Sequence, residues 1–248
     1  MRLTTTHMTI LSFAVLAIGC APAPEPPAQT AAPAPELVGS VLDAAGQQAL
    51  TPEQVLADLK AGNQRFVDGK LTARDYMAQA EATAVGGQYP KAIVLGCLDS
   101  RVPPEIIFDQ GIGDIFVGRV AGNFENVDML GSFEFGAKVA GSKVIVVLGH
   151  TQCGAVKGAA DGVELGNLTE MLANFDEALA EAKTLVEGKF DSSNDAFVQA
   201  AVEANVRKTV SDIAAQSEIL SGMIDNGELL VVGGVYDLPT GWVKWLDG

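Results

Sequence analysis

Short apolar runs alternate with stretches of helical periodicity from about residue 40 to the end of the chain. Lys91 to Gly96 reads KAIVLG and Lys143 to Gly149 reads KVIVVLG, and both runs are rich in β-branched residues. Runs of this kind are typical of strands that are buried on both faces, as in a parallel sheet. Asp114 to Ala121 predicts a third strand, and Leu229 to Tyr236 followed by Trp242 to Leu246 predicts a last strand and an edge hairpin.

A helix is predicted to begin after Thr51 and to run to about Asp68. Thr51 is a favourable cap, Pro52 suits the first helical position, and Gln54 completes a capping box. The helix therefore precedes the first predicted strand, and its apolar residues form one face for a sheet to cover.

Two more helices are predicted after the second strand run. Asn167 is the expected cap of the first, with Glu170 at the box position, and the second spans about 193 to 222. Apolar residues follow Asn167 at helical spacing: Leu168, Met171, Leu172, Phe175 and Leu179. The pattern as a whole predicts a single α/β domain over residues 40–248, with a mainly parallel central β-sheet flanked by helices.

The start of the chain has the pattern of a targeting signal. Residues 8–19 form an apolar run of 12, which is too short to span a bilayer and fits a signal peptide over residues 1–19. Leu16 to Cys20 resembles a bacterial lipoprotein signal, in which the cysteine becomes the first mature residue and receives lipid, although the leucine lies one position earlier than usual. An ordinary cleaved signal and a buried N-terminal helix are the alternatives.

Residues 20–39 are predicted to form a tether between the lipidated Cys20 and the domain. Six prolines and six alanines fall within residues 21–36, a composition that favours an extended spacer. Its reach is on the order of 50 Å at about 3.1 Å per residue. The protein is therefore expected to be exported to the periplasm and to touch the membrane through the lipid anchor only.

Charge and residue counts exclude several classes of protein. With 16 basic against 31 acidic residues, the chain carries a net charge of -15 and has no basic stripe, so nucleic acid is not an expected partner. Three cysteines are too few for a disulfide framework. Of the two histidines, His7 lies in the predicted signal peptide, which leaves His150 as the one imidazole of the domain.

Soft metal ligands follow two of the predicted strands. Cys97 comes directly after one run, His150 comes directly after another, and Cys153 lies at an expected helix start. Ligand sites of open α/β sheets lie outside the carboxyl ends of parallel strands, so these side chains are predicted to meet. Two thiolates and an imidazole suit zinc, and three protein ligands leave one position open for catalysis. The helix start is also expected to lower the pKa of the Cys153 thiol.

Two simpler interpretations compete with a metal site. A lone cysteine after a strand is often a small core residue, and His-x-x-Cys occurs often without metal. A disulfide between Cys97 and Cys153 would suit an oxidising compartment. Neither interpretation accounts for His150 or for Asp99 and Arg101, which can form a bidentate pair that holds the carboxylate ionised beside the metal.

These motifs resemble those of the β-class carbonic anhydrases, over roughly residues 50–246. Gly96 to Pro103 (GCLDSRVP) is similar to the Cys-x-Asp-Ser-Arg motif of that family, and Gly149 to Gly154 (GHTQCG) to its His-x-x-Cys motif. Asp109 to Gly111 and Arg119 to Asn123 are similar to the bacterial branch.

The resemblance implies one zinc ion per chain on Cys97, His150 and Cys153, with Asp99 and Arg101 as a catalytic dyad. It implies reversible hydration of carbon dioxide to bicarbonate and a proton, in which zinc-bound hydroxide attacks the substrate. Asp99 is a possible fourth zinc ligand in a closed state. Further residues would bind substrate: Gln88, Phe116, Ala121 and Gly154.

The resemblance also implies a homodimer or a larger homo-oligomer. One position departs from plant-type members, because Phe135 stands where they carry a tyrosine. Two other functions remain open at this point. A relative on the same fold could hydrolyse carbon disulfide or carbonyl sulfide, and a lipoprotein could hold zinc for stability without catalysis.

Overall fold

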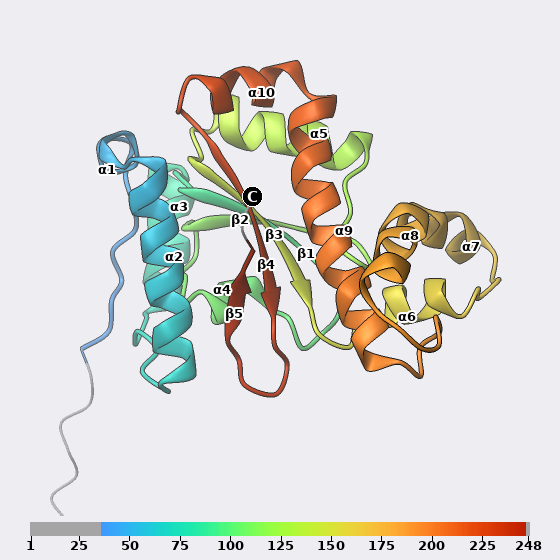
Figure 1. The fold of residues 1–248 in the computed structure, drawn as a ribbon. Coiled ribbons are helices and arrows are strands. Elements are labelled where there is room, and N and C mark those ends of the chain that lie inside the picture. The colour runs from blue at the N-terminus through green and yellow to red at the C-terminus, as the bar shows by residue number, and fades with distance from the viewer. Residues whose placement is uncertain (1–35, 247–248) are drawn as a thin grey trace, which may run out of the picture. The chain divides into compact units, whose positions relative to one another are not determined.

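A five-stranded sheet forms the centre of the computed structural model, which describes residues 36–246 (Figure 1). The strand order is β2-β1-β3-β4-β5, with β4 and β5 antiparallel and every other neighbouring pair parallel. The strands are β1 (Ala92–Gly96), β2 (Ile115–Arg119), β3 (Val144–His150), β4 (Leu230–Tyr236) and β5 (Val243–Trp245). This confirms the predicted α/β fold with a mainly parallel sheet and an edge hairpin.

Helices cover both faces of the sheet. Those before and between the first strands are α1 (Ala44–Ala49), α2 (Pro52–Val67), α3 (Tyr76–Gly86), α4 (Pro104–Ile107), α5 (Val127–Glu134) and the π-helix η1 (Phe135–Val139). Those after β3 are α6 (Gly154–Ala160), α7 (Asn167–Leu172), the 3-10 turn η2 (Ala173–Phe175), α8 (Asp176–Leu185), α9 (Asp195–Gln216) and α10 (Glu218–Asp225). Figure 1 shows α2 on one side of the sheet and α9 on the other.

Alternate residues of the buried strands belong to two separate cores. Val94 of β1 packs in the core that holds Leu59 of α2, whereas Leu95 packs in the core that holds Val202 of α9. Successive side chains of a strand point to opposite faces, so a strand covered on both sides must be apolar throughout. This is the reason that β1 and β3 appear in the sequence as unbroken apolar runs.

The order of the strands creates a crevice beside β1. From β1 the chain passes to β2 on one side, and from β2 it returns to β3 on the other side of β1. The connections that leave β1 and β3 at their carboxyl ends therefore diverge, which opens space for a ligand between them. Cys97 follows β1 and His150 ends β3, so the crevice coincides with the predicted site.

Two predicted helix boundaries are wrong. Asn167 is the first residue of α7 and not its cap, because Gly166 takes the capping position with φ of 47° and no side chain caps this helix. The predicted continuous helix then breaks at η2 before it resumes as α8. The predicted helix over 193–222 also breaks, because Ser217 is extended and its Oγ accepts a hydrogen bond from Leu220 N at 3.2 Å, which starts α10.

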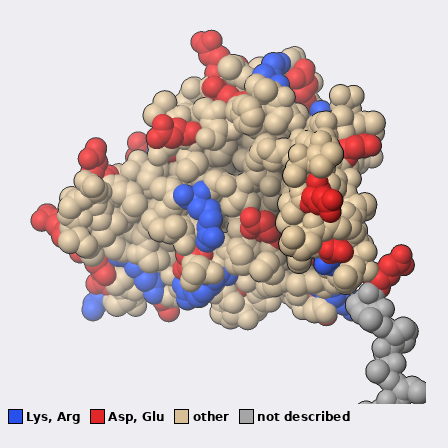
Figure 2. Space-filling model, turned by 180° about the vertical axis from the view of Figure 1, so that it is seen from behind, with Lys and Arg blue, Asp and Glu red and all other residues tan. Residues whose placement is uncertain are grey.

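The signal peptide, Cys20 and most of the tether lie outside the described residues, so the domain boundaries stay predictions. Within residues 36–246, no helix combines the length and apolar character needed to cross a membrane. On the face drawn in Figure 2, basic side chains gather in the middle and along the lower edge, while acidic ones are spread across it.

A buried carboxylate ties the N-terminal segment to the rest of the fold. The Asp109 side chain is fully buried and accepts hydrogen bonds from Arg65 Nε at 2.5 Å, from Arg74 Nη1 and from Thr72 Oγ1 at 2.8 Å. Burial alone would raise the pKa of Asp109, but these donors outweigh burial and hold it below its usual range. The carboxylate thus joins α2 and the segment before α3 to the loop that leads to β2.

We expect Asp109→Ala to lower the free energy of unfolding by about 3–5 kcal/mol, because two arginines would lose a buried partner. Urea unfolding of both proteins measures this change. Asp68→Ala is the control: Asp68 pairs with Lys70 at the surface, where a pair contributes about 1 kcal/mol or less.

The pKa of Asp109 is lower in the folded protein than in the unfolded chain. The ionised carboxylate therefore contributes its full share of the free energy of unfolding at any pH above the usual pKa of Asp. This share is lost as the pH falls through the lowered pKa of the folded state. The difference between the wild type and Asp109→Asn should therefore shrink in acid. A difference that stayed constant from pH 7 to the acid limit would contradict this assignment.

Candidate metal centre

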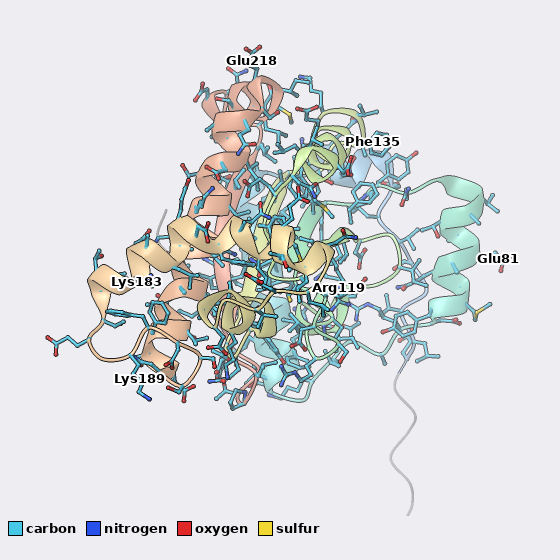
Figure 3. The ribbon with its side chains drawn as sticks, turned by 90° about the vertical axis from the view of Figure 1, so that its right-hand side faces the viewer. Glu81, Arg119, Phe135, Lys183, Lys189 and Glu218 are labelled. Atoms are coloured by element: carbon cyan, nitrogen blue, oxygen red, sulfur yellow. The ribbon has the colours of Figure 1, made fainter. Side chains whose placement is uncertain are left out.

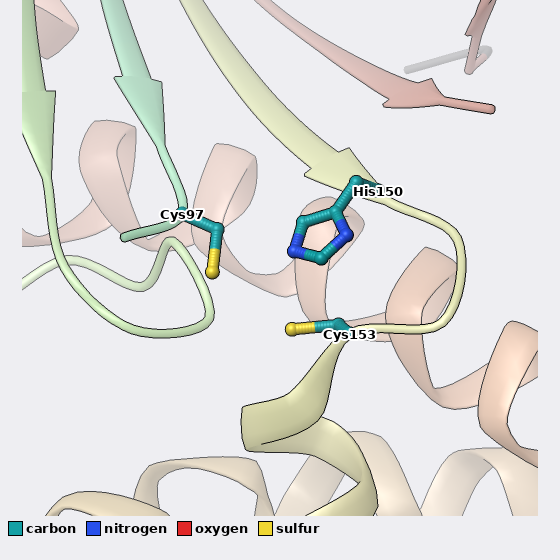
Figure 4. Close-up of side chains that lie close together, drawn as sticks. All are labelled: Cys97, His150 and Cys153. Carbon is teal, nitrogen blue, oxygen red and sulfur yellow. The ribbon is translucent and has the colours of Figure 1, made fainter. Parts of the chain in front are cut away.

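Three predicted ligands converge at the carboxyl ends of β1 and β3. Cys97 follows β1, His150 is the last residue of β3, and Cys153 is the residue before α6 (Figure 4). Their ligand atoms all lie within 4.8 Å of one another, and all three residues are buried. The predicted meeting of two strand ends and a helix start is confirmed.

The geometry of His150 leaves one ring nitrogen free to bind metal. Its Nδ1 lies 2.9 Å from the carbonyl oxygen of Thr151. A carbonyl oxygen only accepts, so Nδ1 carries the proton and Nε2 presents a lone pair. Among the described residues, Nε2 is buried without a hydrogen-bond partner. A buried, unpaired acceptor is costly, and a metal ion at this point would satisfy it.

The two thiols share one hydrogen bond, and the cysteines are free rather than joined in a disulfide. A hydrogen bond from Cys153, opposed by burial, lowers the pKa of Cys97 to about 4, with a smaller contribution from the Gly122 amide. The same hydrogen bond and burial raise the pKa of Cys153. The expectation that the α6 start lowers the pKa of Cys153 is therefore wrong in its net direction, although the backbone amides of α6 act as expected.

A tight turn after β2 delivers a backbone donor to Cys97. Asn123 N donates to Val120 O at 3.0 Å, and Gly122 has φ of 86°, as the third residue of a type II turn requires. Gly122 N lies 3.2 Å from Cys97 Sγ. A Cβ at Gly122 would also approach Phe175 Cζ to 2.1 Å, so only glycine fits here.

Asp99 and Arg101 form the predicted pair beside the three ligands. Arg101 Nε donates to Asp99 Oδ1 at 2.9 Å and Nη2 donates to Oδ2 at 2.7 Å, while the Arg101 amide also donates to Oδ1 at 2.9 Å. These bonds lower the pKa of Asp99 to about 2, against a smaller opposing effect of burial. Asp99 Oδ2 lies 3.9 Å from His150 Nε2, so an ionised carboxylate borders the metal position.

Arg119 is a site residue to which the sequence assigned no role. From the end of β2 its Nε donates to the carbonyl oxygen of Cys97 at 2.8 Å, and its Nη2 donates to that of Asp99. Arg119 therefore holds the backbone on which a metal ligand and the carboxylate both sit. Its place at the carboxyl end of the strand next to β1 is the signal that could have identified it.

The four predicted substrate residues fall into two groups. Ala121 precedes Gly122 in the turn that touches Cys97, and Gly154 follows Cys153, so both lie beside the ligands. Phe116 lies three positions before Arg119 in β2, about 10 Å further back along the sheet. Gln88 precedes β1 and so lies at the amino end of the parallel strands, opposite the end that carries the ligands. One copy of the chain therefore does not bring Gln88 and Phe116 to the metal position.

Phe116 belongs instead to an outer surface. Its ring lies 6.3 Å from that of Phe135, and both line a cavity of about 590 Å³ beside β2, which is an edge strand. Figure 3 shows Phe135 on the outside of the molecule, well apart from Arg119. Gln88 lines a second hollow of about 330 Å³ with Gln47 and other residues near the start of β3.

Residues 92–243 match the family model described as carbonic anhydrase. Carbonic anhydrase 2 of Mycobacterium tuberculosis is 40% identical over 185 residues, which cover 74% of this chain and 87% of that protein. The carbonic anhydrase of Mycolicibacterium smegmatis is 36% identical, covering 75% and 89%.

Solved structures agree with these matches. The β-carbonic anhydrase CafA of Aspergillus fumigatus is 28% identical with a TM-score of 0.59, covering 79% of this chain and 90% of that one. The Coccomyxa β-carbonic anhydrase, solved in complex with acetazolamide, is 29% identical with a TM-score of 0.59, covering 77% and 86%.

We expect Cys153→Ser to reduce bound zinc from about one ion per chain to a small fraction, because a serine hydroxyl is a poor zinc ligand. Metal analysis of the purified chain after dialysis measures the change. Cys20→Ser is the matched control, since it removes the third cysteine without touching the ligands. Equal zinc in Cys153→Ser and the wild type would contradict the ligand set.

Proposed function

The chain belongs to the β-class carbonic anhydrases, zinc enzymes that hydrate carbon dioxide reversibly, and we propose that Asp99 and Arg101 direct that reaction in this protein. The observation that carries the proposal is the position of Asp99, held on Arg101 by three hydrogen bonds and 3.9 Å from His150 Nε2. An acceptor at this place can orient a nucleophile toward carbon dioxide.

The donor set fits zinc. Two thiols and one imidazole nitrogen lie within 4.8 Å of one another, and a tetrahedral ion would keep its fourth position for a small molecule. When bound, zinc supplies a Lewis acid that makes water a nucleophile near neutral pH. Cys97, His150 and Cys153 would hold the ion, and all three residues are buried.

Asp99 contributes an acceptor that stays ionised. Because its pKa is lowered to about 2, the carboxylate remains charged at every pH at which the enzyme would work. It accepts a hydrogen bond from the attacking water or hydroxide and so aims the oxygen lone pair at the substrate carbon. Arg101 occupies both carboxylate oxygens, which favours an Asp99 that stays off the metal over one that closes the site as a fourth ligand.

We expect Asp99→Ala to lower kcat for carbon dioxide hydration by about 10²-fold or more, because the nucleophile would lose the group that orients it. Stopped-flow hydration with zinc analysis on the same sample measures this. Asp161→Ala is a matched control, because Asp161 lies at the end of α6 and its carboxylate accepts a hydrogen bond from Ser192 N at 2.8 Å rather than from a residue of the site.

Full zinc and undiminished hydration in Asp99→Ala would refute the role of Asp99. Full zinc in the wild type with no hydration between pH 7 and 8.5 would refute the proposed reaction itself. Carbon disulfide, which presents a similar linear electrophile, would then be the next substrate to assay.

We also propose that the chain works as a homo-oligomer. β2 pairs with β1 on one side only, and its outer side has no strand partner within residues 36–246. Exposed apolar side chains of Val127 and Phe135 lie beside it. Two Sordaria macrospora β-carbonic anhydrases, 25% identical in the structure compared, are described as tetrameric. A neighbouring copy packed on this edge would cover Phe135 and would place Phe116 at a subunit interface, where it can contribute to a site that one chain leaves incomplete.

The N-terminal pattern supports the further proposal of an exported lipoprotein anchored through Cys20. We expect Cys20→Ser to move the protein from the membrane fraction to the soluble fraction, since one lipidated residue would be the whole attachment. Cell fractionation measures this, and Cys153→Ser is the control that should stay in the membrane fraction. A wild-type protein found in the soluble fraction without detergent would contradict the anchor.

A further inference from the structure

A buried asparagine of α9 contacts the turn that faces the metal ligands. Asn205 is 2% exposed, and its Nδ2 donates to the carbonyl oxygen of Gly122 at 2.9 Å. The same turn of α9 packs on β3, because Val202 and Val206 lie against Gly149, the residue before His150. Asn205 thus projects from a long helix that is already fixed against the strand that carries the histidine.

The contact matters because the orientation of the Ala121–Gly122 peptide decides whether an N–H group or a carbonyl oxygen faces Cys97 Sγ. In a type II turn the central peptide, here between Ala121 and Gly122, points the opposite way from a type I turn. In the observed orientation the Gly122 amide points at Cys97 Sγ at 3.2 Å. A flip of this peptide would present the Ala121 carbonyl oxygen to the thiolate instead, and two negative groups would face each other.

Asn205 binds the next peptide of the turn, between Gly122 and Asn123. Its bond to the Gly122 carbonyl fixes the rotation of Gly122, whose positive φ distinguishes the two turn types. Phe175 and Ala155 pack against Gly122 on the face where a Cβ would project. The Val120–Asn123 turn is therefore held from within by its own hydrogen bond and from outside by the Asn205 amide.

A role confined to filling space does not explain an asparagine at this position. Among the described residues, Asn205 Oδ1 is buried and has no hydrogen-bond partner. Burying an amide oxygen unpaired is unfavourable, and a leucine, which has the same branching and no polar atom, would avoid that cost. The side chain is useful here for the one bond that it makes, and that bond goes to the turn beside Cys97.

We propose that Asn205 is a positioning residue for the zinc ligand Cys97: through the Gly122 carbonyl it keeps the Gly122 amide directed at the sulfur. The proposal rests on zinc binding by Cys97 and adds a residue to that centre. An N–H donor withdraws charge from a thiolate, so this bond sets how strongly the sulfur donates to the metal. Loss of Asn205 should leave the ligand set complete but change the electronic character of the metal–sulfur bond.

Two spectroscopic measurements on the full chain test the proposal. In the wild type loaded with ¹¹³Cd²⁺, the Gly122 amide proton should couple to the metal through the N–H···S bond. In the protein loaded with Co²⁺, the sulfur-to-cobalt charge-transfer band of Asn205→Ser should move to longer wavelength, because a sulfur without its N–H donor is a stronger electron donor. Competition with a chelator should show zinc binding weakened by about 10 to 100-fold, because Cys97 would lose the contact that orients its sulfur toward the metal.

Asn63→Ser is the matched control. Asn63 is also 2% exposed and also donates to a backbone carbonyl at 2.9 Å, that of Gly241, but it lies on α2 in the other core. Its replacement should cost stability while leaving the cobalt band and the zinc affinity unchanged. If Asn205→Ser does not fold, Asn205→Leu gives the same comparison, since it fills the space with an uncharged side chain that donates no hydrogen bond.

The outcomes separate this inference from the proposed function. A wild-type cobalt band and an unchanged Gly122 coupling in Asn205→Ser would overturn the role of Asn205. A ¹¹³Cd-loaded wild type with no coupling at Gly122 would overturn the role of the turn. A wild-type chain that binds neither Co²⁺ nor Cd²⁺ would instead overturn the zinc centre itself, and the inference with it. A shift in Asn205→Ser that Asn63→Ser does not share supports the proposal.

Discussion

Parallel pairing of β1 with β3 sets the spacing on which the metal centre depends. Gly96 pairs with Leu148, so the next residue, Cys97, lies opposite Gly149 and one position from His150. A slip of one residue would move Cys97 by about 3.3 Å relative to His150 and would exchange the strand side chains between the two cores. The two cores prevent such a slip, because every residue of β1 and β3 is buried on the face it now occupies. Packing that is remote from the site thus fixes the distance between a thiol and an imidazole.

The features that the sequence predicted correctly are those in which the functional residues lie within or directly after a short, recognisable sequence pattern. β1 and β3 are recognisable because strands covered on both faces are unbroken apolar runs, and Cys97 and His150 stand at their ends. Asp99 and Arg101 are two residues apart, so their pairing is a property of one turn. Few steps separate sequence from geometry in these cases.

The remaining features depend on competition between opposing local effects or on contacts between residues that are far apart in the sequence. Asn167 and Gly166 are adjacent candidates for one cap, and only the turn that enters α7 decides between them. The order in which the thiols ionise depends on a Cys97–Cys153 contact that outweighs the start of α6. Asn205 meets Gly122 across 83 positions of sequence, so no local pattern could have indicated the contact. Phe116 lies on an edge strand of a single chain, so its final surroundings depend on how copies of the chain assemble and not on how one chain folds.

The chain as a whole is strongly negative, whereas the groups that surround Asp99 and the cysteines are positive or are hydrogen-bond donors. A net charge of -15 produces a field that neutral carbon dioxide does not feel but that an anion does. Within the site, Arg101, Arg119 and the Gly122 amide supply positive charge or donors around the thiolates and Asp99. The ligands and Asp99 are thus stabilised by neighbours a few ångströms away, although Arg101 itself is exposed, while the surface field is screened by salt within about 10 Å. The charged groups of the site therefore depend on these near neighbours for their stability and not on the acidic exterior.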